Sequence, residues 1–161
     1  RAAVDETLRT TAELTRYART GRYDEVERLC RAFQSAWPAQ VRCVTFGTTP
    51  ERRPMLALVA SADGVLTPED ARARGRPVVL VQAGIHAGEI DGKDAGFEML
   101  RDALQGRIAP GALGRVTWVF VPVLNVDGHE RFGAWHRPNQ VGPAEMGWRS
   151  TAQNLNLNRD Y

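Results

Sequence analysis

His86 and Glu89 are the residues whose types and spacing point most directly to chemistry. A neutral imidazole nitrogen and a carboxylate oxygen are both good ligands for zinc. Only two residues separate them, and one is Gly88, which lets the turn fold so that both side chains face one point. The pattern predicts two ligands of a metal site, although the same pair also suits the cap of a following helix.

The stretch before His86 must position this pair. Residues 78–83 read VVLVQA, are apolar apart from Gln82, and lie between Pro77 and Gly84. Such a run predicts a strand that is buried on both faces of a sheet. In open α/β sheets ligands gather outside the carboxyl ends of the strands, so this position makes the metal interpretation as good as the helix cap.

A second apolar run, residues 116–124, reads VTWVFVPVL and predicts another buried strand. The strand–helix–strand order implies a right-handed parallel crossover, with the two strands side by side or nearly so. Pro122 cannot donate a ladder hydrogen bond, so pairing is expected to stop near it. This arrangement brings Asn125–Gly128 close to His86 and Glu89.

The hydrophobic pattern predicts further elements on either side of these strands. In chain order they are a helix over Asp5–Thr20, a helix over Tyr23–Ala36, a hairpin of Val41–Phe46 and Met55–Ala60, a short helical turn after Thr67, and a helix over Asp91–Leu104. The buried side of the last helix is expected to carry Ala95, Phe97, Met99 and Leu100. From Asn125 onward the chain is irregular but rich in aromatic residues, which indicates a functional segment rather than a disordered one.

Composition narrows the class of protein. The chain has 161 residues, 43% of them hydrophobic, which fits one domain or part of a larger one. No run of 18 apolar residues is present, so we expect no membrane span. Its 21 basic residues are all Arg except Lys93, are scattered among acids and leave a net charge of only +2, which argues against a nucleic-acid partner.

The two cysteines, Cys30 and Cys43, have no metal-type spacing and are expected to be buried free thiols. A disulfide is the alternative if the protein is exported. The chain begins at Arg1 rather than Met, so the N-terminus is expected to be trimmed. A periplasmic or secreted location therefore stays open, since a signal peptide would have been removed.

Five short motifs, in this order, together resemble the zinc carboxypeptidase family, the carboxypeptidase A-like metallopeptidases. They are the hairpin turn Gly47–Pro54, the strand end Gly84–Glu89, the Asn125–Gly128 turn, the Trp148-Arg149 pair and Leu157–Arg159. The resemblance implies an α/β fold with a mixed, largely parallel sheet flanked by helices. Residues 1–161 would form the N-terminal portion of a single catalytic domain, with a helical lead-in over about residues 1–38.

The resemblance also implies a role for each matching residue. His86 and Glu89 would bind one zinc ion, and Arg149 would polarise the scissile carbonyl. Asn158 and Arg159 would hold the terminal carboxylate of a peptide substrate. An Arg fork matches a carboxylate bidentately, and a neighbouring Asn adds a neutral donor. Judged without the resemblance, the better interpretation makes Arg149 a surface residue and Arg159 a buried partner of Asp127 or Asp160, since Arg is mostly exposed.

The sequence departs from the family pattern in several places. Gly88 stands where carboxypeptidase A has Arg, and Val126 replaces the Pro of the turn. The family's third zinc ligand, general base and mobile Tyr lie beyond the end of this chain, and neither His129 nor His136 matches the ligand position. We therefore expect a truncated fragment with weak zinc binding, little peptidase activity, and an open apolar sheet edge through which it dimerises or aggregates.

Two other functions fit the same residues. One is a deacylase or other amidohydrolase on the same scaffold, because such enzymes also use a His-x-x-Glu pair and a later Asn-Arg pair. The other is a module that binds a carboxylate without catalysis.

Overall fold

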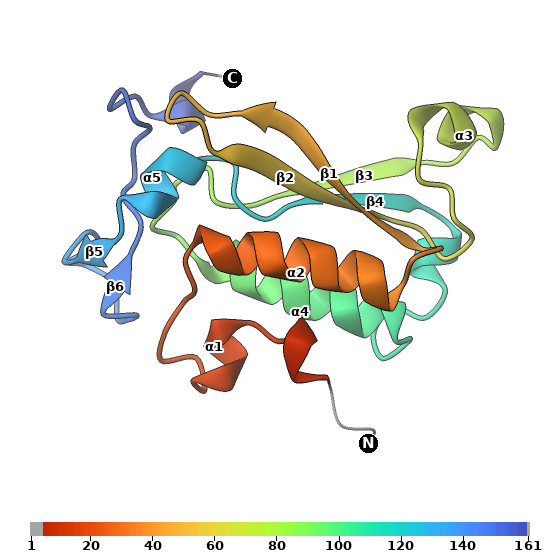
Figure 1. Cartoon of the computed structure of the whole chain (residues 1–161), viewed down its shortest axis with the longest axis horizontal. Helices are drawn as coiled ribbons and strands as arrows, with labels where there is room; N and C mark the ends of the chain where they lie inside the picture. The colour runs from red at the N-terminus through yellow and green to blue at the C-terminus, as the bar shows by residue number, and fades with distance from the viewer. Residues whose placement is uncertain (1–4, 161) are drawn as a thin grey trace.

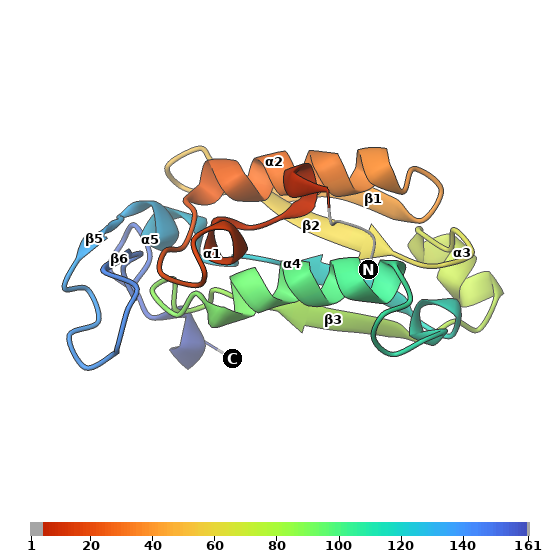
Figure 2. The same ribbon diagram turned by 90° about the horizontal axis from the view of Figure 1, so that it is seen from below.

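A four-stranded sheet carries both long helices on one of its faces (Figures 1 and 2). The computed structural model describes residues 5–160. The strands are β1 (Val41–Thr48), β2 (Pro54–Ala60), β3 (Val78–Gln82) and β4 (Thr117–Val121), in the spatial order β1-β2-β4-β3. The long helices are α2 (Tyr23–Ala36) and α4 (Asp91–Leu104), at the residues expected from the sequence.

The pairing within the sheet confirms an α/β fold with a mixed sheet. β3 and β4 are parallel and adjacent, as the crossover predicts, and their pairing runs as far as Gln82 and Val121, just before Pro122. β1 with β2 and β2 with β4 are antiparallel, so the described sheet is less parallel than expected. The reason is that β2 enters through a hairpin rather than through a crossover helix.

The strand β3 was expected to be buried on both faces, and this is wrong. Val78 and Leu80 are 54% and 61% exposed. Alternate side chains of a strand point to opposite faces, and no element of the described chain covers the face that carries these two residues. The outer edge of β3 also has no partner strand within residues 5–160. β3 is thus an apolar edge strand.

The expected helix over Asp5–Thr20 is interrupted. It consists of a 3-10 turn η1 (Glu6–Leu8) and a short helix α1 (Thr11–Leu14). Thr10 and Glu13 form a capping box that starts a new helix at Thr11. Arg16 and Tyr17 have positive φ angles, which end it. Local capping therefore outweighs the hydrophobic pattern that predicted one continuous helix over Asp5–Thr20.

The buried side of α4 differs from the expected one. Phe97 and Leu100 are buried as predicted, but Ala95 and Met99 are exposed. Lys93 and Arg101 are buried instead. They bind the N-terminal segment, with Lys93 donating to Gly21 O and Arg101 to Leu8 O, so contacts with that segment and not only the apolar periodicity set which side is covered.

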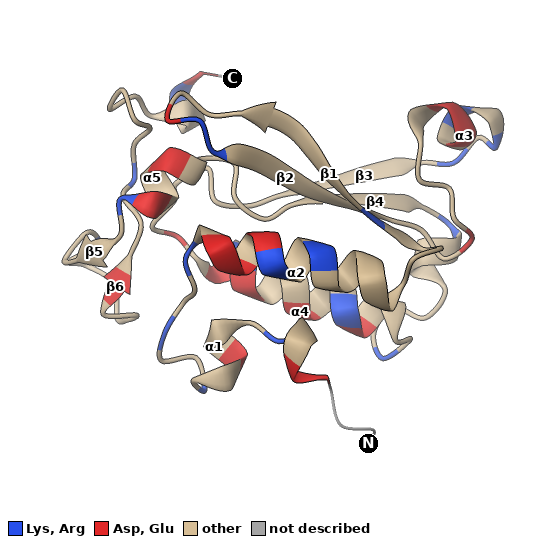
Figure 3. Ribbon diagram, in the orientation of Figure 1, with Lys and Arg blue, Asp and Glu red and all other residues tan. Residues whose placement is uncertain are grey.

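Cys30 and Cys43 form a disulfide that joins α2 to β1. The expectation of two free thiols is therefore wrong, because the helix packs its cysteine directly over the first strand. The core beneath α2 and α4 contains Leu29, Phe33, Leu58, Phe97 and Phe120. Charged residues gather on helices and loops, and in α2 the acids lie near the start of the helix and the bases follow them (Figure 3).

Shorter elements complete the described chain. They are α3 (Pro68–Ala73), η2 (Ala112–Gly114), α5 (Val126–Glu130), β5 (Gly133–Ala134), β6 (Glu145–Met146) and η3 (Leu157–Arg159). α5, β5 and β6 lie at the end of the sheet opposite α3 (Figure 1). Within residues 5–160, no helix has both the length and the apolar character needed to cross a membrane.

Candidate metal and substrate site

The turn after β3 brings His86 and Glu89 together. His86 Nδ1 lies 3.2 Å from Glu89 Oε1, and the N–H of Glu89 donates to the carbonyl of His86 at 2.9 Å. Gly84 starts the turn with a φ of 62°, and a Cβ there would lie 2.9 Å from Val123 Cα. Only glycine allows this close backbone approach at a positive φ. The side chain of His86 is 8% exposed and that of Glu89 is 43% exposed, so the carboxylate is the solvent-facing member of the pair.

The geometry of this pair fits two ligands of a zinc ion. With metal–ligand bonds of ~2.1 Å, two donors of a tetrahedral site lie about 3.4 Å apart, close to the 3.2 Å between Nδ1 and Oε1. Across residues 5–160, however, no group of three or more His, Cys, Asp or Glu side chains is placed to hold a metal. The described residues therefore provide two converging donors and no third.

Asn156 fixes the other side of the imidazole. Its Oδ1 lies 3.1 Å from His86 Nε2 and also accepts the N–H of Asn158 at 3.1 Å. Because an amide oxygen only accepts, a His86 ring that binds a metal through Nδ1 would carry its proton on Nε2 and donate it to Asn156. A cation between Nδ1 and the carboxylate would satisfy both groups. Asn156 was not among the predicted site residues, and its position two residues before Asn158 was its only signal.

Arg137 supplies a positive charge to Glu89. Its Nη2 donates to Glu89 Oε1 at 2.7 Å, although the two residues are far apart in the chain. Partial burial raises the pKa of Glu89, but the hydrogen bond and charge of Arg137, together with His86, outweigh it and lower the pKa below its ordinary value. This residue was also missed, since nothing in the irregular segment around it distinguishes it from other arginines.

Asn125 joins the predicted turn to the segment that carries Arg149. Its N–H donates to Gly84 O at 3.0 Å, and its Nδ2 donates to Arg149 O at 3.3 Å. Its Oδ1 accepts the N–H of Gly128 and so caps α5. The turn and the 86–89 loop are therefore adjacent, as predicted. Arg149 itself is half-buried, and its guanidinium makes no hydrogen bond or ion pair with any residue in the described range.

Asn158 and Arg159 lie in η3, and both are exposed. Arg159 Nη1 donates to Asn158 O at 2.7 Å, so the two residues are held together. Asp127 does not pair with Arg159. It is bound by Thr49 and Arg53 of the β1–β2 turn, each at 2.7 Å. The 3.1 Å contact of Asn156 with Asn158 links η3 to His86.

The remaining histidines have other surroundings. His129 is 1% exposed, and its Nδ1 lies 3.4 Å from Glu130 Oε1. Burial lowers the pKa of His129, with Glu130 opposing the effect. His136 Nδ1 lies 3.2 Å from Met146 O, and its ring packs edge-on against Trp148. Neither joins the His86–Glu89 pair in a cluster of metal-ligand type within the described chain.

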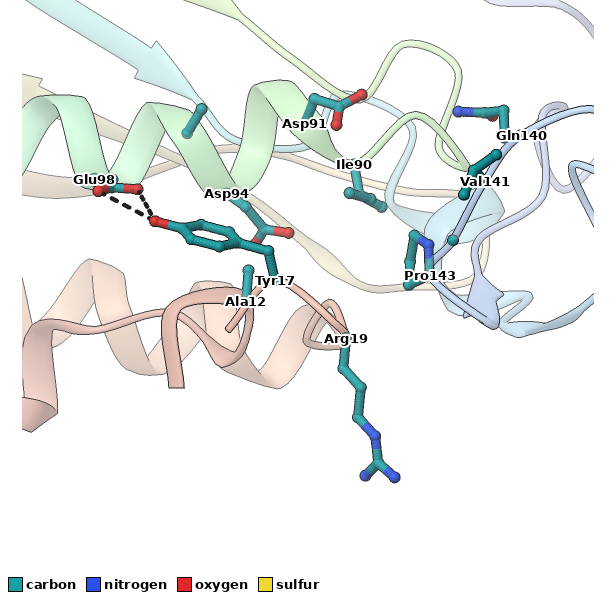
Figure 4. Close-up of a pocket in the computed structure, with 12 residues that line it drawn as sticks. Ala12, Tyr17, Arg19, Ile90, Asp91, Asp94, Glu98, Gln140, Val141 and Pro143 are labelled. Carbon is teal, nitrogen blue, oxygen red and sulfur yellow. Dashed lines mark hydrogen bonds between the residues drawn. The ribbon is translucent and has the colours of Figure 1, made fainter. Parts of the chain in front are cut away.

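A cavity of about 350 Å³ lies next to the 86–89 loop, between α1, α4 and residues 140–143 (Figure 4). Three carboxylates line it, Asp91, Asp94 and Glu98. Asp94 is bound by Thr20 and Lys93, and Glu98 by the Tyr17 hydroxyl, while Arg19 points away. The cavity contains none of the predicted site residues, and two of its three acids, Asp94 and Glu98, already have partners, so we assign it no role.

Comparison with protein families identifies the class to which this site belongs. A model of the zinc carboxypeptidase family matches residues 26–161. The chain therefore belongs to the zinc carboxypeptidase family. None of the curated proteins matches its sequence.

Solved structures of carboxypeptidases share the fold. Carboxypeptidase A from Helicoverpa armigera is 21% identical with a TM-score of 0.61, over 71% of this chain and 26% of that one. A metallo-carboxypeptidase from Burkholderia cenocepacia is 28% identical with a TM-score of 0.53, over 84% and 32%. Bovine thrombin-activatable fibrinolysis inhibitor, solved with a tick carboxypeptidase inhibitor, is 18% identical with a TM-score of 0.61, over 84% and 38%. The chain thus spans about a quarter to two fifths of these structures.

Proposed function

We propose that this chain is the N-terminal portion of the catalytic domain of a zinc-dependent metallocarboxypeptidase, which hydrolyses the C-terminal peptide bond of its substrate. The observation that carries the proposal is the convergence of His86 Nδ1 and Glu89 Oε1 at 3.2 Å, at the carboxyl end of β3, in a member of the zinc carboxypeptidase family. When bound, zinc would lower the pKa of a water molecule and polarise a carbonyl.

The chain's own residues have separate tasks in this proposal. His86 and Glu89 hold the ion, and Asn156 fixes the ring of His86. Arg149 is tied to the Asn125 turn through its backbone carbonyl. Its guanidinium has no hydrogen-bond or ion-pair partner among residues 5–160 and is assigned to stabilise the oxygen of an attacked carbonyl. A substrate is a peptide with a free C-terminal carboxylate, held by Asn158 and Arg159.

The chain as it stands is proposed to bind zinc weakly and to have little or no peptidase activity. A catalytic zinc has three protein ligands and one open position, whereas residues 5–160 bring only two donors together. A third ligand and a general base would have to come from outside this range.

The test measures zinc content and peptidase activity for this chain and for a longer chain that continues past Tyr161. Stoichiometric zinc and cleavage in the longer chain alone would support the proposal. Tight stoichiometric zinc in the 161-residue chain would mean that a third ligand lies within it, and would contradict the proposed weak site. Comparing peptides with free and amidated C-termini tests whether cleavage needs the free carboxylate, as a carboxypeptidase requires. Binding of the free peptide without cleavage by the longer chain would instead favour a carboxylate-binding module.

A further inference from the structure

Arg137 reaches the metal-ligand pair from a distant part of the chain. It lies in the connection between β5 and β6, and its side chain is 16% exposed. The side chain of Arg137 passes over Gly88 on its way to Glu89, because a Cβ on Gly88 would lie 3.2 Å from Arg137 Cγ and 3.4 Å from Arg137 Cδ. The same Cβ would lie 2.6 Å from Gly147 O. Gly88 therefore leaves room for the arginine side chain.

Arg137 and His86 meet at one oxygen. Glu89 Oε1 accepts from Arg137 Nη2 at 2.7 Å and lies 3.2 Å from His86 Nδ1. An ion held by Nδ1 and Oε1 would share that oxygen with the guanidinium. Two positive charges at such a short separation repel each other, and the partly buried position of Arg137 limits the screening by water.

We propose that Arg137 competes with the metal for Glu89. In the metal-free chain the guanidinium occupies the carboxylate and keeps it beside His86. Metal binding then requires Arg137 to leave Oε1, so the positive charge of this residue weakens the affinity of the pair for a divalent cation. The inference rests on the proposed metal role of His86 and Glu89. Arg137 is a positioning residue in this proposal, and the segment between β5 and β6 is the element that would have to move.

The experiment measures zinc affinity of the whole 161-residue chain by competition with a chromophoric chelator. Arg137→Gln removes the charge and keeps a side chain of similar length. Arg72→Gln, on the exposed surface of α3, is the matched control because it changes the net charge equally. We expect Arg137→Gln to bind zinc about tenfold more tightly than the unsubstituted chain and Arg72→Gln to bind it equally.

Other results would overturn the inference. An unchanged affinity would mean that Arg137 does not compete, and a loss of ~10–100-fold would mean that it supports the ligand Glu89 from outside. Failure of both the unsubstituted chain and Arg137→Gln to take up zinc would overturn it as well. Adding His86→Ala to Arg137→Gln must abolish the gain. If the gain persists, zinc binds elsewhere and the proposed function fails, whereas a failure of Arg137→Gln alone leaves that function intact.

Discussion

Asn156 Oδ1 lies 3.1 Å from Nε2 of His86, across 70 residues of sequence. This contact ties the segment that carries Asn158 and Arg159 to the turn that carries His86 and Glu89. Outer partners of this kind fix the tautomer and the orientation of a metal-binding histidine. Asn156→Leu should therefore lower zinc affinity by ~10–100-fold, measured by chelator competition on whichever chain, this or a longer one, binds zinc measurably.

Asn156→Asp serves as the matched control because it keeps an oxygen acceptor at the same place. It should retain most of the affinity, while Asn139→Leu on the exposed β5–β6 connection should change nothing. Equal losses in the Leu and Asp variants would indicate that the contact supports only the local fold. The far-ultraviolet circular dichroism of each variant checks that the chain remains folded.

Lys93 is the single lysine of the chain and is 1% exposed. Its Nζ lies 2.9 Å from both Glu25 Oε2 and Asp94 Oδ1, and 3.0 Å from Gly21 O. Removing one partner of a buried ion pair leaves uncompensated charge, which costs about 3–5 kcal/mol. Lys93→Met should lower the free energy of unfolding by about this amount in urea denaturation. A change below ~1 kcal/mol would contradict the buried network.

The sequence predicts the long elements and fails where tertiary contacts decide. The apolar periods gave the bounds of α2 and α4, and the parallel pairing of β3 with β4 followed from the order of elements. The side of α4 that is buried was misjudged, because Lys93 and Arg101 reach carboxylates on segments that the pattern of one helix does not include. The burial of a charged side chain can be predicted from the sequence only when the oppositely charged partner is known.

In the candidate site, too, the residues that follow regular strands were predicted and those in the irregular segment were not. His86, Glu89 and the Asn125 turn were predicted to lie together because they follow two adjacent parallel strands. Arg137 and Asn156 were missed, since each comes from the irregular segment whose path no periodicity predicts. The disulfide between Cys30 and Cys43 was also judged wrongly, because its geometry depends on how α2 crosses β1 and not on the spacing of the cysteines.

This disulfide should contribute to stability. It closes a loop with a sequence separation of 13 residues between α2 and β1. Constraining such a loop in the unfolded chain stabilises the fold by about 2–4 kcal/mol. Replacing both cysteines by alanine should lower the free energy of unfolding by about this amount, and adding a reductant should affect only the unsubstituted chain. Two reactive thiols in the unreduced, denatured protein would contradict the bond.

Glu130 links α5 to the first turn of α2. Its Oε1 accepts the N–H of Tyr23 at 2.9 Å, and its Oε2 lies 3.1 Å from Arg22 Nη2. Burial raises the pKa of Glu130, but the hydrogen bonds from His129 and Tyr23 and the charge of Arg22 outweigh it and lower the pKa to about 2. The carboxylate also lies at the positive end of the α2 dipole.

A lowered pKa in the folded state fixes the sign of the pH dependence. The contribution of Glu130 to stability is fully present above the unfolded value of 4.5 and is lost as the pH falls through that value toward about 2. Glu130→Gln should reduce stability by about 1–2 kcal/mol at pH 7 and flatten the decline between these pH values. Urea denaturation at pH 7, 4 and 3 measures both effects, and an identical pH profile for the two chains would contradict the assignment.

The exposed strand β3 should make the chain associate with itself. Its outer edge has no partner strand within residues 5–160, and Val78, Val79 and Leu80 are 54%, 42% and 61% exposed. An unpaired edge with apolar side chains is a template for pairing with a second copy. We expect dimers or larger species in sedimentation velocity, and Leu80→Lys should shift the chain toward monomer because a buried lysine opposes edge pairing. Thr45→Lys, on the opposite edge strand β1, is the control and should leave association unchanged. A monodisperse monomer of the unsubstituted chain at concentrations up to the millimolar range would contradict this expectation.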